Sequence, residues 1–119
     1  MGIVKINGKY VSYNTYDNET VTCRNCDILY MIRTADIKRD WCCPVCGSKL
    51  QINFWHKDAE WTVMRMRDYE LRKGMMFVIK HRMTSHNILE IKKYTNGTKL
   101  HLKGQGSYKI KNDEFYEVC

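Results

Sequence analysis

Apolar and polar positions alternate along much of the chain, and this alternation predicts short β-strands. Residues 3–13 are expected to form a hairpin, because Asn7-Gly8 supplies the two positive-φ positions of a tight primed turn. The same period-two alternation in residues 49–55 predicts another strand. Between these two segments we expect a polar connector, a strand and a loop, at residues 14–20, 27–33 and 34–40 respectively.

The second half of the chain has the pattern of several short strands separated by turn signals. Asn96-Gly97 is the strongest hairpin signal, and Gly74 and Gly104 mark further turns. A helix over residues 61–83 is the alternative, although Gly74 would interrupt it. The predicted strands are residues 61–67, 75–83, 88–94, 98–103, 107–110 and 115–118, and residues 84–87 are predicted to form a loop.

A boundary between two small domains is expected at residues 56–60, where a polar stretch separates two patterned regions. The first domain would then comprise residues 1–56 and the second residues 57–119. A domain of about 50 residues buries too little apolar surface to fold unaided, so the first domain is expected to need a metal ion or disulfides. The predicted fold class is mostly β, with a small β-barrel as the second domain.

The first domain contains two C-x2-C pairs, formed by Cys23, Cys26, Cys43 and Cys46. Two residues between cysteines let a tight turn direct both sulfur atoms at one ion, and amides of the turn donate hydrogen bonds to the thiolates. The pattern therefore predicts one structural Zn2+ ion bound by these thiolates. A shell of protein ligands alone leaves no position for an activated water molecule, so the zinc is not expected to be catalytic.

An iron centre of the rubredoxin type and a pair of disulfides are the alternatives to zinc. Iron is disfavoured because Asp27 stands where the first pair would need a following glycine, whereas Gly47 follows the second pair. Disulfides are rare in cytosolic proteins, whose thiols stay reduced. Cys42 competes with Cys43 as the third ligand, but the sequence Cys-Pro-x-Cys-Gly favours Cys43, and Cys119 is expected to be incidental.

Two family resemblances follow from these motifs. Residues 20–55 resemble the zinc-ribbon family, most specifically in the sequence Cys-Pro-Val-Cys-Gly-Ser at residues 43–48. That resemblance implies a structural metal and a fold with two knuckles, but no single function. Residues 61–118 resemble small SH3-like or Tudor-like barrels, which often open with a leucine, a turn containing glycine and an apolar strand. Here Leu71 and Gly74 precede the apolar strand predicted at residues 75–83.

Basic residues give the chain a formal net charge of +7, or roughly +5 once thiolates hold a zinc ion. Tyr94, Tyr108 and Tyr116 are interleaved with them, and basic strands with aromatic residues bind phosphates and stack bases. The alternative is that lysines on outer strand faces provide solubility and block edge pairing. The predicted nucleic-acid contacts are Arg65, Arg67, Arg72, Lys73, Lys92, Lys93, Lys99, Lys103, Lys109 and Lys111.

Two hypotheses of function follow from charge and motif. The first is a non-enzymatic zinc-ribbon protein that associates with nucleic acid, as a module or regulator. The second is a protein-binding adaptor or inhibitor, motivated by the tryptophan and methionine content and aimed at a host polymerase or defence factor if the protein is phage-encoded. We find no glycine-rich phosphate loop, nucleophile elbow or histidine–carboxylate motif, so neither an enzyme nor a small-molecule substrate is expected.

Composition bears on origin and location. Alanine and proline are scarce while lysine, asparagine and tyrosine are common, which suggests an AT-rich coding sequence of the kind found in many bacteriophages. Residues 1–20 lack the pattern of a secretory signal, and no apolar run approaches the roughly 18 residues that span a bilayer. The expected location is the cytoplasm, that of the host if the protein is phage-encoded, without a membrane partner.

Overall fold

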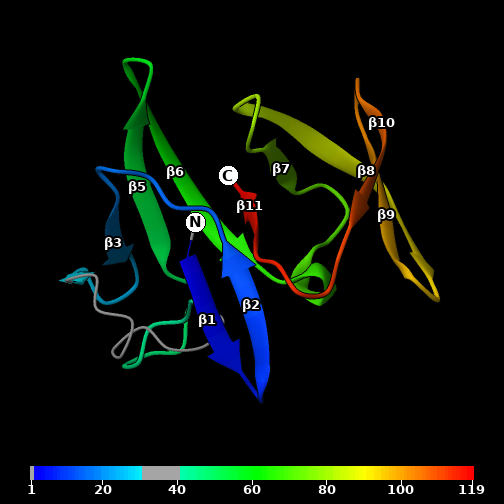
Figure 1. Ribbon diagram of the computed structural model, residues 1–119. Helices are drawn as coiled ribbons and strands as arrows, with labels where there is room; N and C mark the ends of the chain where they lie inside the picture. Colours follow the sequence, from blue (N-terminus) through cyan, green and yellow to red (C-terminus); the bar gives the residue numbers. More distant parts are fainter. Residues whose placement is uncertain (1, 31–40) are drawn as a thin grey trace.

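The computed structural model describes residues 2–30 and 41–119 and confirms the mostly β fold (Figure 1). Among these residues the only helical element is a short 3-10 helix, η1. The elements are β1 (Gly2–Ile6), β2 (Lys9–Tyr13), β3 (Thr20–Cys23), β4 (Ile28–Tyr30), β5 (Gln51–His56), β6 (Ala59–Met66), η1 (Asp68–Glu70), β7 (Met76–Ile79), β8 (Thr84–Tyr94), β9 (Gly97–Leu102), β10 (Gly106–Ile110) and β11 (Tyr116–Val118).

The N-terminal hairpin forms as predicted and stands apart from the main sheet. Strands β1 and β2 form a separate two-stranded sheet, and a parallel β-bridge between Ser12 and Glu114 connects this sheet to the segment before β11. Ile6 and Lys9 flank the turn, in which φ is 49° at Asn7 and 83° at Gly8. Both central residues therefore have the left-handed conformation that a primed two-residue turn requires, which Asn and Gly adopt more easily than other residues.

The remaining strands of the described residues form one sheet in the order β10-β9-β8-β7-β11-β6-β5-β3-β4. Neighbouring strands are antiparallel, and the last strand of the chain, β11, lies between β6 and β7. Figure 1 shows β8, β9 and β10 on one side of the molecule and β3 and β5 on the other. The two predicted chemical sites, the cysteines and the lysine-rich strands, thus belong to opposite ends of the sheet.

The predicted domain boundary at residues 56–60 falls in the turn between β5 and β6. Lys57 and Asp58 form that turn with φ of 48° and 62°, and β5 and β6 pair along their length. The first core cluster also spans this point, because it joins buried residues of the N-terminal half with Val78 and Phe115. Strand pairing and packing therefore cross the boundary, and the division into two domains stays a prediction.

A second core cluster fills the C-terminal half. Its centre is apolar, with Phe77, Ile88, Leu100 and Leu102 all nearly inaccessible to solvent. These side chains lie on one face of β7, β8 and β9, so the opposite face of β8 and β9 is left to solvent. The alternation seen in the sequence produces this division between a buried and an exposed face.

Two expectations about the elements are wrong, and two segments lie outside the described residues. The helix proposed as an alternative over residues 61–83 does not form: β6 and β7 lie within that range, and the only helical turn in it is the short η1. Residues 84–87 are not a loop: they begin β8 and pair with β7. Their polar side chains gave no strand pattern, but their backbone forms hydrogen bonds with the neighbouring strand β7. The end of the strand predicted over 27–33 and the loop predicted over 34–40 lie in the part that the structure does not describe.

Candidate metal centre and basic sheet face

The two C-x2-C pairs converge on one point. The sulfur atoms of Cys23, Cys26, Cys43 and Cys46 all lie within 4.8 Å of one another, and the Cys23 and Cys46 sulfurs are 3.5 Å apart. Sulfur atoms about 2.3 Å from a tetrahedral zinc ion lie about 3.8 Å apart. The four thiols therefore form a single site with the dimensions and donor chemistry of a structural zinc centre.

The residue that follows each cysteine pair has a left-handed backbone conformation. Gly47 follows the second pair with φ of 77°, and Asp27 follows the first pair with φ of 56°. Aspartate is among the few residues that tolerate this left-handed region. Asp27 thus takes the place of the glycine whose absence was counted against iron, so that absence does not discriminate between the metals.

Hydrogen bonds within the knuckles prepare the thiols for a metal. The amide of Cys26 donates to Cys23 Sγ at 3.4 Å, and the amide of Gly47 donates to the Cys43 carbonyl at 2.8 Å. Hydrogen bonds from the side chain and backbone of Ser48, and from Asn25, lower the pKa of Cys46 to about 5. Cys46 is therefore a thiolate at neutral pH, the form in which cysteine binds zinc.

The site is anchored in the first core cluster. Cys23 and Cys43 are buried, whereas Cys46 is exposed, so the ion would lie at the edge of the core. A hydrogen bond to Cys46, burial and contacts with the other thiols raise the pKa of Cys26 to about 12. That thiol must lose its proton when zinc binds. Cys42 lies outside the cluster, in a β-bridge with Lys49, so Cys43 and not Cys42 belongs to the group that could hold the ion.

Two of the predicted nucleic-acid contacts are buried: Arg65 on β6 and Arg67 between β6 and η1, with exposed fractions of 0% and 8%. That part of the prediction is wrong, because neither guanidinium group is available to a phosphate. The Arg65 guanidinium lies 4.2 Å from the Trp41 ring and 4.9 Å from the Tyr13 ring. It also forms an ion pair of 3.0 Å with Glu19. Arg65 therefore joins β6 to the N-terminal connector and to Trp41, which lies two residues before the second cysteine pair.

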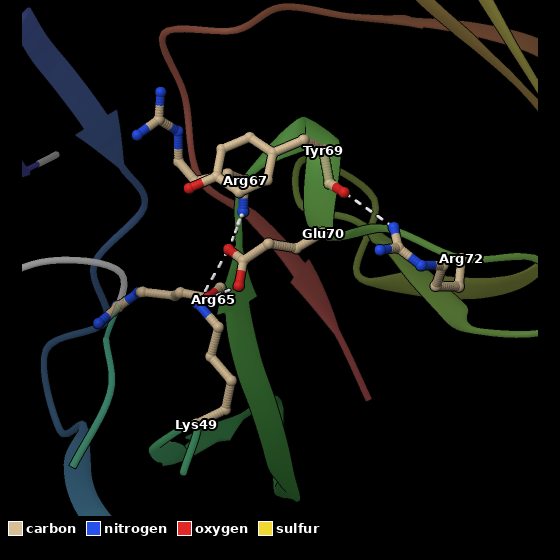
Figure 2. Close-up of polar contacts among 6 residues, drawn as sticks. All are labelled: Lys49, Arg65, Arg67, Tyr69, Glu70 and Arg72. Carbon is tan, nitrogen blue, oxygen red and sulfur yellow. Dashed lines mark hydrogen bonds and ion pairs between the residues drawn. The ribbon is translucent and has the colours of Figure 1, made fainter. Parts of the chain in front are cut away.

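A second polar network surrounds η1 (Figure 2). Lys49 Nζ contacts the carboxylate of Glu70 at 2.9 Å and donates to the Arg65 carbonyl at 3.0 Å. The same carboxylate accepts a hydrogen bond of 2.8 Å from the Arg67 amide. Arg72 folds back at the end of η1, where it donates to the Tyr69 carbonyl at 2.8 Å. These contacts are structural and fix the turn between β6 and β7.

The lysines of β8, β9 and β10 form a different arrangement. Lys92 of β8 is directly opposite Lys99 of β9, and Lys99 is directly opposite Lys109 of β10. Residues opposite one another in antiparallel strands project from the same face, with Cβ atoms about 4.5–5.5 Å apart. Lys92, Lys99 and Lys109 therefore form a row across three strands, which we call the lysine row. The row lies on the face opposite the buried residue Leu100.

The other predicted contacts are distributed around this face. Tyr94 is 55% exposed and lies two residues beyond Lys92, hence on the same face. Tyr108 and Tyr116 instead pack against the second core cluster and do not offer an open ring. The remaining predicted basic residues are exposed, near the row or at turns: Arg72, Lys73, Lys93, Lys103 and Lys111.

The sequence alone does not predict the alignment of the lysines, because the alignment depends on the register of the strands. Period two places Lys92, Tyr94 and Lys99 on one face in an antiparallel hairpin near residue 96 whose loop has two residues. Which residues are directly opposite depends on the turn. The structure closes the hairpin on residues 95 and 96, with Tyr94 opposite Gly97. The expected turn at Asn96-Gly97 would have placed a different pair of residues opposite each other.

Comparisons with protein-family models, with curated proteins and with solved structures found no match to this chain. No helix formed by residues 2–30 and 41–119 is long and apolar enough to cross a membrane. The geometry of the chain itself therefore has to support any proposal of function, and it shows a mostly β protein with a four-cysteine site that fits one zinc ion.

Proposed function

We propose that this protein is a non-enzymatic zinc-ribbon protein that binds nucleic acid through the outer face of β8, β9 and β10. The observation that carries the proposal is the lysine row. Like charges directly opposite one another weaken a sheet, so the fold gains nothing from placing Lys92, Lys99 and Lys109 together. A polyanion would relieve this repulsion, because lysines that contact phosphates release the counterions around the nucleic acid.

The zinc site has a separate role in this proposal. Its thiolates close the coordination shell, so the ion holds the knuckles of residues 20–55 and activates no water molecule. It lies at the end of the sheet away from β8, β9 and β10 (Figure 1). The zinc ribbon is therefore proposed as the structural half of the molecule and the lysine row as the binding half.

Binding to labelled oligonucleotides at two salt concentrations tests the proposal. We expect affinity to fall steeply between about 50 mM and about 200 mM salt. Replacing Lys92, Lys99 and Lys109 by glutamine should weaken binding and reduce the slope of log K against log salt by about 2, since each phosphate contact contributes about 0.7–0.9. No binding to DNA or RNA at low salt would overturn the proposal.

A matched control distinguishes the lysine row from general positive charge. The triple variant Lys5→Gln, Lys9→Gln and Lys57→Asn removes the same charge from exposed positions elsewhere. Asparagine is chosen at residue 57 because φ there is 48°, a conformation that asparagine tolerates. We expect this control to retain most of the affinity. Equal losses in the two triple variants would assign the binding to net charge alone.

One observation favours the second candidate function, that of a protein-binding adaptor. Trp55 near the end of β5 is 58% exposed, whereas Trp41 is buried. Asn18 accepts a hydrogen bond of 3.1 Å from the Trp55 amide and so fixes the strand that presents the ring. Exposed tryptophans on rigid elements are typical anchors of protein interfaces. Trp55 is therefore the residue on which a protein partner would depend.

The two functions are separated by one pair of variants. In a pull-down from bacterial lysate, a partner that binds at Trp55 is expected in stoichiometric amount with the native protein and to be lost with Trp55→Ala. The lysine-row variant should retain such a partner. If no stoichiometric protein is recovered with the native chain, the adaptor function is rejected, while the oligonucleotide measurements remain decisive for the first proposal.

A further inference from the structure

The outer face of β8, β9 and β10 is hollowed at the tip of the β8–β9 hairpin. The tip hollow has a volume of about 440 Å3 and is lined by Tyr94, Asn96, Gly97, Thr98, Lys99, Lys109, Ile110 and Lys111. Sites for small ligands typically measure about 300–1,000 Å3. The hollow therefore has room for one nucleotide, and its lining combines an aromatic ring with lysines.

Gly97 keeps the middle of this hollow open. It is directly opposite Tyr94, and its φ of 147° lies in the region that favours glycine. A Cβ atom at this position would lie 3.1 Å from the carbonyl oxygen of Ile110. A side chain here is disfavoured by both conformation and space, and the glycine leaves one side of the Tyr94 ring without a cross-strand neighbour.

The aromatic ring and the positive charges of the hollow lie next to each other. Lys99 Nζ is 5.5 Å from the centre of the Tyr94 ring, within the range of a cation–π contact. Lys109 and Lys111 line the other side of the hollow. A smaller hollow of about 120 Å3 lies along the same face and shares Tyr94 and Lys99 with the first. Glu90 and His101, which are directly opposite each other, line this smaller hollow farther from the hairpin tip than Lys99, so positive charge is concentrated toward the tip.

We propose that the ligand of this face is single-stranded nucleic acid, with one unpaired base stacked on Tyr94 in the tip hollow. The adjoining phosphates contact Lys99, Lys109 and Lys111. A base in a duplex has both faces covered by its neighbours, whereas an unpaired base has a free face to stack on an exposed ring. Stacking on an aromatic ring is tolerant of sequence, since every base has a π-face. This inference rests on the proposed nucleic-acid function and specifies its substrate.

Fluorescence anisotropy with the zinc-loaded full chain tests this inference. The probes are single-stranded DNA and RNA of about 15 nucleotides and a duplex of the same length. We expect tighter binding of the single strands than of the duplex. Tyr94→Ala should weaken single-strand binding by about tenfold or more, whereas Tyr94→Phe keeps the stacking face and should bind within about twofold of the native protein.

Tyr10→Ala is the matched control for the loss of an exposed tyrosine. Tyr10 is 68% exposed on the N-terminal hairpin, and Lys5 Nζ lies 5.5 Å from its ring, the same separation as between Lys99 and Tyr94. This variant should bind like the native protein. Both tyrosines lie at the surface, so we expect each variant to keep the native fold. Thermal melting of each variant checks this.

The outcomes separate the inference from the function on which it rests. Equal or tighter binding of the duplex, or unchanged single-strand affinity in Tyr94→Ala, would overturn the single-strand inference and leave nucleic-acid binding intact. Absence of binding to all three probes at low salt would reject both. Inorganic polyphosphate could also bind with the same affinity as the single strands, with Tyr94→Ala changing neither affinity. That result would show that the face recognises phosphate charge without a base.

Discussion

Positively charged side chains have opposite roles in two parts of the sheet. On β6, Arg65 is fully buried, stacked on Trp41 and paired with Glu19. On β8 and β9, Lys92 and Lys99 are directly opposite each other on a solvent-facing surface. The arginine therefore contributes to the fold through contacts that solvent cannot replace, whereas the lysines repel one another.

The same division applies to the cores behind these charges. The first core cluster includes two zinc ligands, Cys23 and Cys43, together with Trp41. The second contains apolar side chains around Phe77 and Leu100 and no cysteine among the described residues. One end of the molecule thus depends on metal and ion pairing, and the other on apolar packing. The difference indicates that variants at the first end should change stability, whereas variants at the second end should change binding.

Removal of zinc is expected to have the largest effect. Cys43→Ser, or treatment with a chelator, should remove stability on the order of 10 kcal/mol, the scale of structural zinc binding. The loss should be local, because the second core cluster contains no ligand. Hydrogen exchange should show β3 and β5 losing protection while β8 and β9 retain more of theirs. Equal loss of protection at both ends would show that the molecule depends on the metal as a whole.

Metal analysis of chelator-free protein provides the control for this result. We expect one equivalent of zinc in the native protein and in Cys119→Ser, whose exposed thiol lies outside the cluster. Iron in place of zinc would be visible as a coloured thiolate centre, and it matters because Asp27 removes the conformational argument against it. Cysteines oxidised in pairs, without metal, would contradict the zinc assignment.

Arg65 is expected to have the next largest effect. Arg65→Ala leaves the Glu19 carboxylate buried without its cation, and breaking a buried ion pair typically costs about 3–5 kcal/mol. Arg65→Lys should recover little, because an ammonium group lacks the planar surface that stacks on Trp41. Urea unfolding of the zinc-loaded protein measures both. A loss below about 1 kcal/mol for Arg65→Ala would mean that the pair is relaxed in solution.

Sequence patterns predicted the metal site more completely than the basic face. The spacing of the cysteines identified all four ligands, because C-x2-C turns direct their sulfurs by local geometry alone. The chain gave no local signal that Arg65 is buried whereas Lys99 is only partly buried. Both alternate with apolar residues on strands, and the difference arises from which element covers the face. For Arg65 that element is the N-terminal connector, about 46 residues earlier in the chain.

The two Asn-Gly sequences show the same limit on hairpin register. Asn7-Gly8 occupies the turn of its hairpin, with Ile6 opposite Lys9. At Asn96-Gly97 the turn shifts toward the N-terminus, and Gly97 becomes the first residue of β9. The side chains keep their faces because the shift preserves the period of two. Their cross-strand partners change, so the lysine row could not be predicted from the sequence alone.

Relief of repulsion in the lysine row is expected to have a smaller effect of opposite sign. Lys99→Thr removes the central charge while keeping good strand propensity, and it should raise the free energy of unfolding by about 0.2–1 kcal/mol at low salt. High salt should abolish most of the gain, because these exposed charges are screened. Urea unfolding at two salt concentrations measures it. A gain that is independent of salt would show that the substitution acts through strand propensity instead.

The smallest effect is expected at Glu117, a buried carboxyl on β11 whose pKa is raised above its ordinary value of 4.5, chiefly by burial. The groups that face it are Tyr16, Arg65, Lys80 and Glu19; the first three favour its charged form, and Glu19 opposes it. A raised folded pKa means that the native state binds the proton more tightly than the unfolded chain. The destabilisation is therefore fully present above the folded pKa and disappears as the pH falls below the unfolded value.

Glu117→Gln should be slightly more stable than the native protein at neutral pH, with the difference shrinking on acidification, because the amide oxygen still accepts the hydrogen bond from the Tyr16 hydroxyl. Urea unfolding of both proteins over a range of pH measures that difference, and a native protein that is the more stable of the two at neutral pH would show that the charged carboxylate is worth more to Arg65 than its burial costs.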